Sequence, residues 1–347
     1  MNAVDSLKYF IPEMFLLAGA FLVLFLDFFV KNKKILFILS LFILSTTAYL
    51  AKSHSQFYPL FYGFFGLDFF THFFRYAALG MVAVTLLVSL AYKPLKQNQG
   101  EYVSLFLFMT FGLIMMAASL NLLMIYMAIE FVSILSYILT GFLKHDTRAN
   151  EAAMKYLLFG SVCSGIMLFG MSYLFGMAGS LELSAIRTKI VQPDFSGIGL
   201  TAFFLVMTGL GFKISMAPFH MWAPDVYEGA PTPVTAFLTV GPKALGFAVM
   251  IRVLSIAFPD SWSQWNSVIT ALSILTMTLG NVIAISQTNI KRLLAYSSIA
   301  QAGYILMGIA VFSEIGLSGV FVYLTAYIFT NLGAFVVVLI ASNHSNT

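Results

Sequence analysis

Apolar runs about as long as a lipid bilayer is thick recur along almost the whole sequence, separated by short turns that hold most of the charges. A transmembrane helix needs roughly 20 apolar residues, because the hydrocarbon core is about 30 Å thick and each residue rises about 1.5 Å. Hydropathy predicts about eleven spans, near residues 10–30, 35–51, 74–92, 102–118, 121–143, 150–177, 198–217, 234–257, 267–286, 292–312 and 317–341. The sequence therefore predicts an all-α polytopic membrane protein.

The composition excludes the common soluble classes. Hydrophobic residues make up 60% of the 347 residues and charged residues only 9%, which is more apolar surface than a soluble domain can bury. The net charge of +4 is small and dispersed, so it indicates neither nucleic-acid binding nor a basic surface face. Cys163 is the only cysteine, so this chain alone forms neither a disulfide nor an iron–sulfur cluster. We interpret the first apolar segment as a retained span and not as a signal peptide.

Cations are unevenly divided between the two sets of loops that alternate along the predicted spans. One set carries nine, namely Lys31, Lys33, Lys34, Lys93, Lys96, Lys144, Arg148, Lys291 and Arg292. The other set carries five, namely Lys8, Lys52, Arg75, Arg187 and Lys189. Because loops rich in lysine and arginine stay in the cytoplasm, we expect the N-terminus outside, the C-terminus in the cytoplasm, and the chain in the inner (plasma) membrane of the cell.

Sliding the sequence by 167 residues reveals an internal repeat. Ser136–Phe142 (SYILTGF) then falls on Gly303–Ile309 (GYILMGI), and Tyr156–Leu157 falls on Tyr323–Leu324. The shift spans five helices, an odd number, so the two copies run in opposite directions, as in many transporters. The alternative is that short apolar sequence matches recur by chance in a chain with so many hydrophobic residues. The counterpart of Lys213 would fall at position 380, so we expect the second broken helix to be absent here, through truncation or reduction.

Four ionisable residues lie in successive apolar spans: Glu130, Lys155, Lys213 and Lys243. A charge at the centre of a span costs about 2.5–3.5 kcal/mol on insertion scales, and such residues usually line ion pathways. We therefore expect the four residues to form a proton relay. The alternative for Glu130 and Lys155 is a permanent structural ion pair. Their predicted depths in the bilayer differ by roughly 12 Å, which favours a water-bridged or switchable coupling over a direct salt bridge.

Prolines interrupt the helices beside two of these lysines. Pro218 follows Lys213 by five residues and lacks the N–H that would continue the helical hydrogen bonds. Burial disfavours the charge of Lys213, whereas the negative end of the broken helix favours it. That balance suits a group that takes up and releases protons. Pro242 directly precedes Lys243 and frees the carbonyl of Leu238 from its usual helical partner.

The segment Met216–Pro233 (MAPFHMWAPDVYEGAPTP) connects the spans of these two lysines. Its prolines, aromatic residues and acids predict a re-entrant or interfacial connection. His220 is either a further relay group, because histidine titrates near neutral pH, or a packed interfacial residue. We expect Asp225 and Glu228 to cap a helix or anchor the loop, and Arg252 to snorkel from the outer end of its span. The dispersed histidines lack zinc-ligand spacing, so no metal site is expected.

Four segments resemble a known family. They are IPEMFLLAGAFLVLFLD, EAAMKYLLFGSVCSG, FKISMAPFHMWAPDVYEGAPTPV and IKRLLAYSSIAQAGYILMG, which occupy residues 11–27, 151–165, 212–234 and 290–308. They are similar to the subunit N family, one of the antiporter-like membrane-subunit families of respiratory NADH–quinone oxidoreductase (complex I). The resemblance covers essentially the whole chain. PDVYEGAPTP is its most specific element, because the sister subunits and the multisubunit sodium/proton antiporters look different there.

The resemblance implies a proton-translocating subunit of an NADH–quinone oxidoreductase, driven by quinone reduction elsewhere in the complex. It implies Glu130 and Lys155 as a coupled pair, Lys213 as the central lysine and Lys243 as the link to a second half-channel. No cofactor is expected in this chain, and NAD, FMN, iron–sulfur clusters and quinone are expected in other subunits. The expected partners are other membrane-arm subunits and the lipid bilayer, without nucleic acid.

The resemblance also implies three parts of the chain: peripheral helices over residues 1–98, a first antiporter-like five-helix repeat over 99–258 and a partial second, inverted repeat over 259–347. This sequence departs from the family at two points. It lacks the further lysine on a second broken helix, and Gln301 stands where many relatives have histidine. Two alternatives follow, a subunit of a multisubunit sodium/proton antiporter and a truncated, non-pumping assembly subunit.

Overall fold

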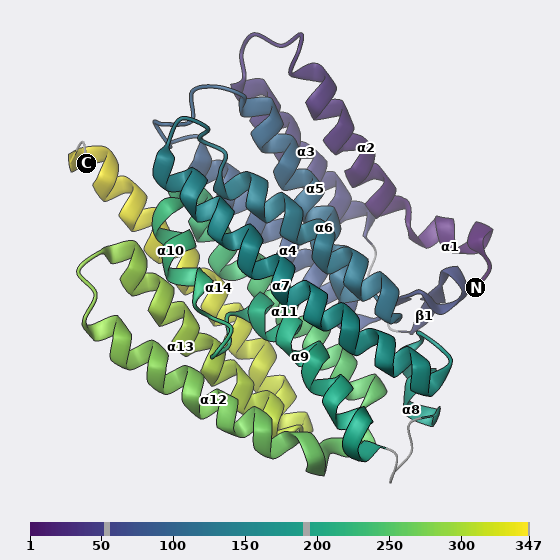
Figure 1. Cartoon of the computed structure of the whole chain (residues 1–347). Helices are drawn as coiled ribbons and strands as arrows, with labels where there is room; N and C mark the ends of the chain where they lie inside the picture. Colours follow the sequence, from purple (N-terminus) through teal and green to yellow (C-terminus); the bar gives the residue numbers. More distant parts are fainter. Residues whose placement is uncertain (52–55, 190–194, 346–347) are drawn as a thin grey trace.

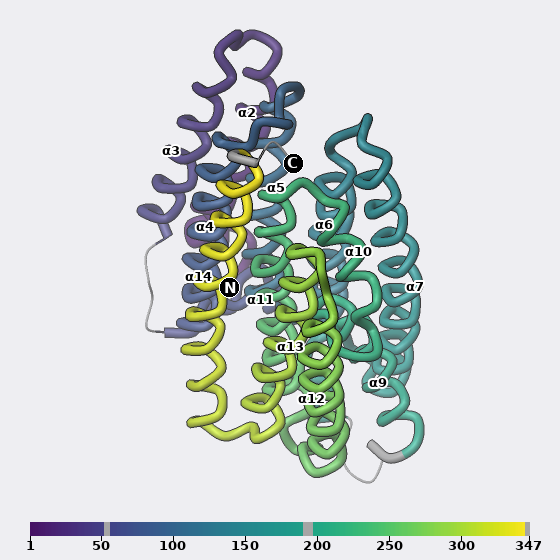
Figure 2. The backbone as a smooth tube through the Cα atoms, turned by 90° about the vertical axis from the view of Figure 1, so that its left-hand side faces the viewer, coloured from purple at the N-terminus to yellow at the C-terminus, as the bar shows by residue number. Residues whose placement is uncertain are grey.

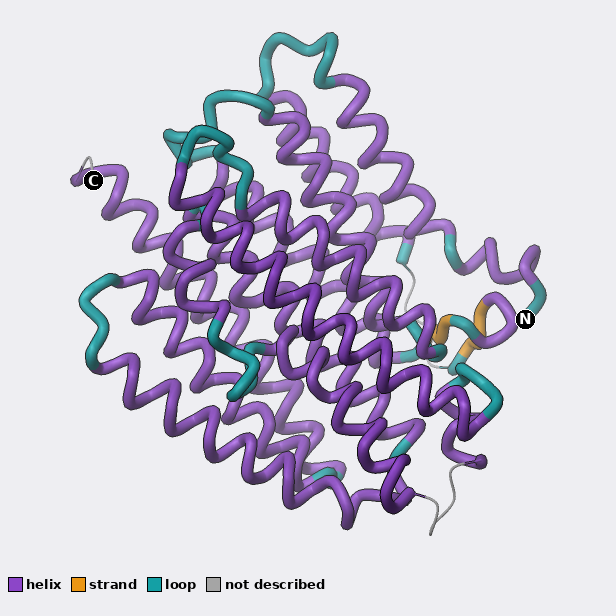
Figure 3. Tube along the Cα trace, viewed as in Figure 1, coloured by secondary structure: helices purple, strands orange, loops and turns teal. Residues whose placement is uncertain are grey.

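The computed structural model describes residues 1–51, 56–189 and 195–345. Long helices lie side by side and make up nearly all of this part of the chain (Figures 1 and 3). The α-helices are α1 (Ala3–Tyr9), α2 (Ile11–Leu26), α3 (Lys34–Leu50), α4 (Phe69–Ser89), α5 (Gln99–Ala118), α6 (Leu122–Thr140), α7 (Thr147–Ala178), α8 (Leu183–Lys189), α9 (Leu200–Ile214), α10 (Trp222–Gly229), α11 (Thr232–Ala257), α12 (Trp262–Ile285), α13 (Ile290–Val311) and α14 (Glu314–Ser345). Two short strands, β1 (Tyr58–Leu60) and β2 (Phe65–Leu67), pair antiparallel with Pro59 opposite Gly66.

The predicted all-α polytopic fold is confirmed. Among the described residues, nine helices are long and apolar enough to cross a membrane. The bent pair α1 and α2 adds a tenth candidate, and α3 is a shorter apolar helix of 17 residues. Each of the eleven predicted spans therefore falls on a helix, and the count depends only on how α2 and α3 are treated.

Polar residues at the helix ends explain where several spans begin. The side chains of Asn121, Asp146 and Asn289 accept hydrogen bonds from the free N–H groups in the first turns of α6, α7 and α13. Such side chains satisfy donors that have no partner within the helix. The caps fix the starts of the three helices that carry most of the candidate site.

Helix α11 forms the centre of the bundle. It packs against α4, α5, α9 and α14, and Figure 2 shows it surrounded by these helices. Its membrane-length window is entirely buried, whereas the outer faces of α7 and α12 are largely exposed apolar surface suited to lipid or to a neighbouring subunit. Charged side chains on α11 therefore lie inside protein and not in lipid.

The two halves of the predicted repeat run in opposite directions. The turn between α6 and α7 lies at one end of the bundle, and the turn between α13 and α14 lies at the other end (Figure 2). An inverted repeat requires this arrangement.

Two arginines are placed differently from the sequence-based expectations. Arg252 does not snorkel: its side chain is 6% exposed, and it binds both carboxylate oxygens of Asp68 at 2.7 and 2.9 Å. Arg75 is not a loop residue, because it lies buried in α4 and forms an ion pair with Glu13 of α2. An opposite charge at hydrogen-bonding distance offsets part of the cost of burying each arginine. Lys52, also counted with the outer loops, lies outside the described residues.

Candidate functional site

The broken helix predicted near residues 215–220 is present. Helix α9 ends at Ile214, and Ser215 has a left-handed backbone with φ of 57°. The N–H of Met216 then bonds back to the carbonyl of Gly211 at 2.8 Å, a pattern typical of a helix end. The N–H of Ala217 bonds to the Thr276 hydroxyl of α12 at 3.0 Å, which ties the break to the second half of the chain.

Lys213 lies in the last turn of α9 and is buried, with 2% of its surface exposed. Its Nζ donates to the hydroxyl of Ser133 on α6 at 2.9 Å. Its stem packs against Gly246 of α11, where a side chain would come within 3.3 Å of the Lys213 Cγ. The same side chain would come within 2.9 Å of Ile214 Cγ2, so Gly246 favours close packing of the end of α9 against the central helix.

Glu130 lies one helical turn before Ser133 on α6 and accepts a hydrogen bond from the hydroxyl of Ser164 on α7. Ser133, on the same face of α6, accepts the hydrogen bond from Lys213. The structure thus brings together Glu130 and Lys213 around one stretch of α6, with serine hydroxyls as their direct partners.

Lys155 has other partners. Its Nζ forms ion pairs with Glu151 of α7 and Asp225 of α10, both at 2.8 Å, and its side chain is 40% exposed. Glu130 instead meets α7 at Ser164, nine residues beyond Lys155 and roughly 13 Å further along the helix. Glu130 and Lys155 therefore form no direct ion pair in this structure.

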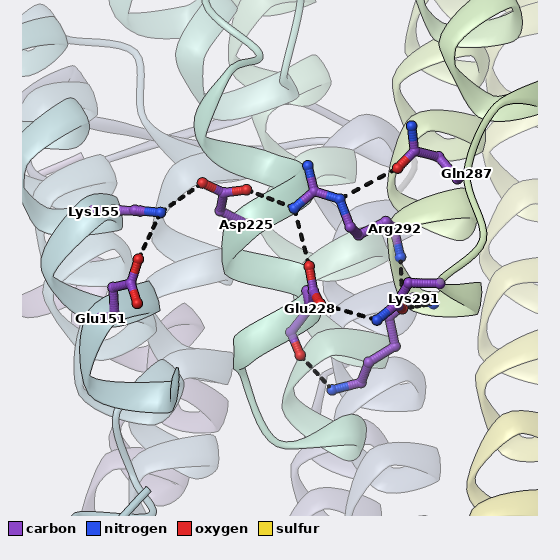
Figure 4. A network of polar contacts seen from close by, with 8 residues as sticks. Glu151, Lys155, Asp225, Glu228, Gln287, Lys291 and Arg292 are labelled. Carbon is purple, nitrogen blue, oxygen red and sulfur yellow. Dashed lines mark hydrogen bonds and ion pairs between the residues drawn. The ribbon is translucent and has the colours of Figure 1, made fainter. Parts of the chain in front are cut away.

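Asp225 joins three helices in a network of ion pairs (Figure 4). One carboxylate oxygen pairs with Lys155 of α7, and the other pairs with Arg292 of α13 at 2.7 Å. Glu228 also pairs with Arg292, at 3.0 Å. Partial burial raises the pKa of Asp225, but hydrogen bonds from Lys155 and Arg292 lower it further, so the group is held below its ordinary value. Both acids therefore anchor α10 between α7 and α13, around a polar pocket of about 310 Å³.

Lys243 is buried on α11, one turn before the Gly246 that packs against Lys213, and only 1% of its surface is exposed. Its Nζ donates to the hydroxyl of Ser298 on α13 at 2.9 Å and to the carbonyl of the same residue at 3.2 Å. The carbonyl of Leu238, which Pro242 frees, accepts a hydrogen bond from the hydroxyl of Tyr227 at 3.3 Å. The ring of Tyr227 also lies 5.8 Å from the Lys243 ammonium.

Two further groups complete this polar region. His220 is half-buried, and its Nδ1 has no hydrogen-bond partner among the described residues. Gln301 lies one turn beyond Ser298 on α13, and its side-chain oxygen accepts a hydrogen bond from the hydroxyl of Tyr323 on α14. Polar groups thus extend from Glu130 through the bundle centre to α14.

Sequence reasoning missed the direct partners of the buried charges. Ser133, Ser164 and Ser298 resemble ordinary small residues of membrane helices, where a serine usually bonds to its own helix. The available signal was spacing, because Ser133 follows Glu130 by one turn and therefore shares its face of α6. No group of three or more His, Cys, Asp or Glu side chains suited to a metal ion occurs in the described ranges.

A broken helix, buried lysines and oppositely directed helix pairs define the class of antiporter-like membrane subunits. Residues 119–347 match the family described as NADH:quinone oxidoreductase/Mrp antiporter, transmembrane. NADH-quinone oxidoreductase subunit N 2 of Sorangium cellulosum is 43% identical over 372 aligned positions, which cover 99% of this chain and 73% of that protein. Subunit N of Trichlorobacter lovleyi is 44% identical over 277 positions, covering 79% and 57% respectively.

The solved structures contain the same fold. A chain of respiratory complex I from Thermus thermophilus with bound aureothin aligns with a TM-score of 0.80 at 29% identity, covering 94% of this chain and 70% of that chain. The chain belongs to the NADH:quinone oxidoreductase/Mrp antiporter family of membrane subunits. Within that family its similarity is to subunit N, so the resemblance found in the sequence is confirmed.

Proposed function

We propose that this chain translocates protons as a membrane subunit of an NADH–quinone oxidoreductase, with Glu130, Lys213 and Lys243 as proton-carrying groups. The observation that carries the proposal is Lys213, a buried lysine at a helix break whose nearest polar partner is a serine beside Glu130. An ionisable group at such a position is costly and is typical of ion pathways. The similarity to subunit N supports the same assignment.

The mechanism follows from the order of these groups across the bundle. A charged Glu130 stabilises the protonated form of Lys213, and a neutralised or displaced Glu130 favours proton release. Lys213 packs against Gly246 of α11, and Lys243 lies one turn before Gly246 on the same helix. Moving one proton against 100 mV costs about 2.3 kcal/mol, which corresponds to a pKa change of less than about two units. A change in pairing is therefore energetically sufficient.

Lys155 has a different place in this proposal. Its ion pairs with Glu151 and Asp225 border the polar pocket at the ends of α7 and α10. We assign Lys155 the role of coupling that pocket to Glu130. The coupling acts through a movement of the Lys155 side chain along α7 or through bridging water. His220 is a further candidate relay group beside the helix break.

The remaining assignments concern the whole assembly. The N-terminus is outside and the C-terminus is in the cytoplasm of a plasma-membrane complex, following the cation count. Residues 1–98 form peripheral helices, residues 99–258 the first repeat and residues 259–347 part of the second. The partners are other membrane-arm subunits, and NAD, FMN, iron–sulfur clusters and quinone are bound by other subunits of the complex.

Purification of the tagged chain in mild detergent tests the proposal. We expect an NADH- or other quinone-reducing module to accompany the chain, and inverted membrane vesicles to acidify when the electron donor is added. Purification with partners that lack redox activity, together with sodium-dependent proton exchange, would instead identify a sodium/proton antiporter. Purification without either activity would identify an assembly subunit.

A further inference from the structure

A pocket of about 600 Å³ lies at the end of the bundle where α4 leads into α5 and α6 leads into α7. The two loops that form it lie at the same end as the turn between α2 and α3 (Figure 1). Both loops of the pocket connect membrane-length helices. The pocket therefore lies at a membrane–water interface.

The rim of this pocket is basic. Lys96 and Lys144 line it from opposite loops, with His145 beside them, and both lysines are exposed. Neither lysine forms an ion pair within residues 1–51, 56–189 and 195–345. Asp146 is the one acid in the lining, and its carboxylate already caps α7 by accepting from the N–H of Arg148 at 2.9 Å. The two lysines outnumber this single carboxylate, so the lining keeps a net positive charge, which favours an anionic ligand.

The pocket also has an apolar side. Phe142 and Leu143 line it directly beyond the end of α6. Below them on the same helix, Ile138 and Ile134 expose about half of their surfaces, at 48% and 53%. A basic rim that continues into an exposed apolar helix face matches an amphipathic anion and not a small inorganic one.

We propose that this pocket binds an anionic phospholipid, with its phosphate between Lys96 and Lys144 and an acyl chain along Ile138 and Ile134 of α6. Basic pockets between membrane helices on the cytoplasmic side are suited to such headgroups, and each lysine near an anionic headgroup strengthens binding. The bound lipid would hold the loop before α5 against the turn before α7. The proposal does not depend on the proton pathway.

Native mass spectrometry of the purified protein, with the subunits that accompany it, tests this site. The protein in detergent is titrated with phosphatidylglycerol, and the population with one tightly bound lipid is counted. The double variant Lys96→Gln/Lys144→Gln should bind that lipid about 30-fold more weakly. The matched control is Lys31→Gln/Lys34→Gln, which removes the same charge from exposed lysines of another loop at the same end.

Four outcomes would overturn the proposal. The double variant could bind phosphatidylglycerol within threefold of the wild type, or the control could lose as much affinity, which would indicate general surface charge. Phosphatidylcholine could bind equally well, which would exclude headgroup recognition. Millimolar inorganic phosphate could displace the lipid, which would identify a site for free phosphate. Because the substituted side chains are exposed, the unfolding temperature of each variant should equal that of the wild type.

Discussion

Replacing Asp68 by asparagine should destabilise the fold far more than replacing Asp260. Asp68 binds Arg252 through both carboxylate oxygens, and the Arg252 side chain is only 6% exposed. Removing one partner of a buried pair costs about 3–5 kcal/mol, because the other charge stays buried and uncompensated. Asp68 itself is 25% exposed and asparagine keeps one acceptor, so the expected loss is about 3 kcal/mol, at the low end of that range.

Asp260 provides the matched control. It pairs with Arg187 at 2.8 Å, but the two side chains are 67% and 48% exposed. Such exposed pairs contribute little to stability, so Asp260→Asn should unfold nearly as the wild type does. Unfolding of both purified variants by titration with sodium dodecyl sulfate in mild detergent measures the free-energy difference. A loss below about 1 kcal/mol in Asp68→Asn, or a loss equal to that of Asp260→Asn, would refute the dependence of Arg252 on Asp68.

The Asp68–Arg252 ion pair also predicts that the stability of the fold depends on pH. Partial burial raises the pKa of Asp68, but hydrogen bonds and charge attraction from Arg252 outweigh this, so the pKa lies below its ordinary value. A carboxyl with a lowered pKa contributes stability that is complete above the unfolded-state pKa and is lost as the pH falls through the folded-state pKa. The wild type should therefore lose stability below about pH 4, and Asp68→Asn should lack this part of the loss.

Three further substitutions are tested by the same unfolding titration. Tyr227→Phe removes the hydroxyl that bonds the carbonyl of Leu238 at 3.3 Å and should cost about 1–2 kcal/mol, whereas an unchanged stability would show that water replaces the bond. Gly246→Ala would place a methyl group 2.9 Å from Ile214 Cγ2 and should cost about 1–3 kcal/mol through overpacking, so a stabilised variant would contradict this packing. Lys155→Gln breaks only half-exposed ion pairs and should cost less than about 1 kcal/mol, so a larger loss would mean that α10 depends on that lysine.

Hydropathy predicted the fold well because the bilayer fixes both the length of each helix and its apolar character. All eleven predicted spans fall on helices, and the break after Ile214 was indicated by Pro218. The helix ends were less predictable: the span predicted at residues 74–92 falls on α4, which begins at Phe69 and ends at Ser89. All four candidate residues lie in predicted spans, but only Lys213 and Lys243 are buried, whereas Glu130 and Lys155 retain exposed surface.

The pairing of the charges could not be predicted, because hydropathy gives the depth of a residue but not the rotation of its helix. Asp225 binds Lys155 and Arg292, which are 70 and 67 residues away in the sequence. Arg252 and Asp68 are 184 residues apart. These contacts depend on how helices from different parts of the chain pack together, and no local pattern records that packing.

The proton-to-electron stoichiometry of the assembled complex containing Lys213→Met tests the central claim most directly. Methionine keeps most of the buried volume of Lys213 but cannot carry a proton, so assembly and quinone reduction should persist while fewer protons move per electron. The measurement uses inverted membrane vesicles with matched NADH oxidation, and Asp260→Asn serves as the control. A lowered stoichiometry in Lys213→Met alone is the predicted result. An unchanged stoichiometry in the assembled variant would contradict proton transfer through Lys213.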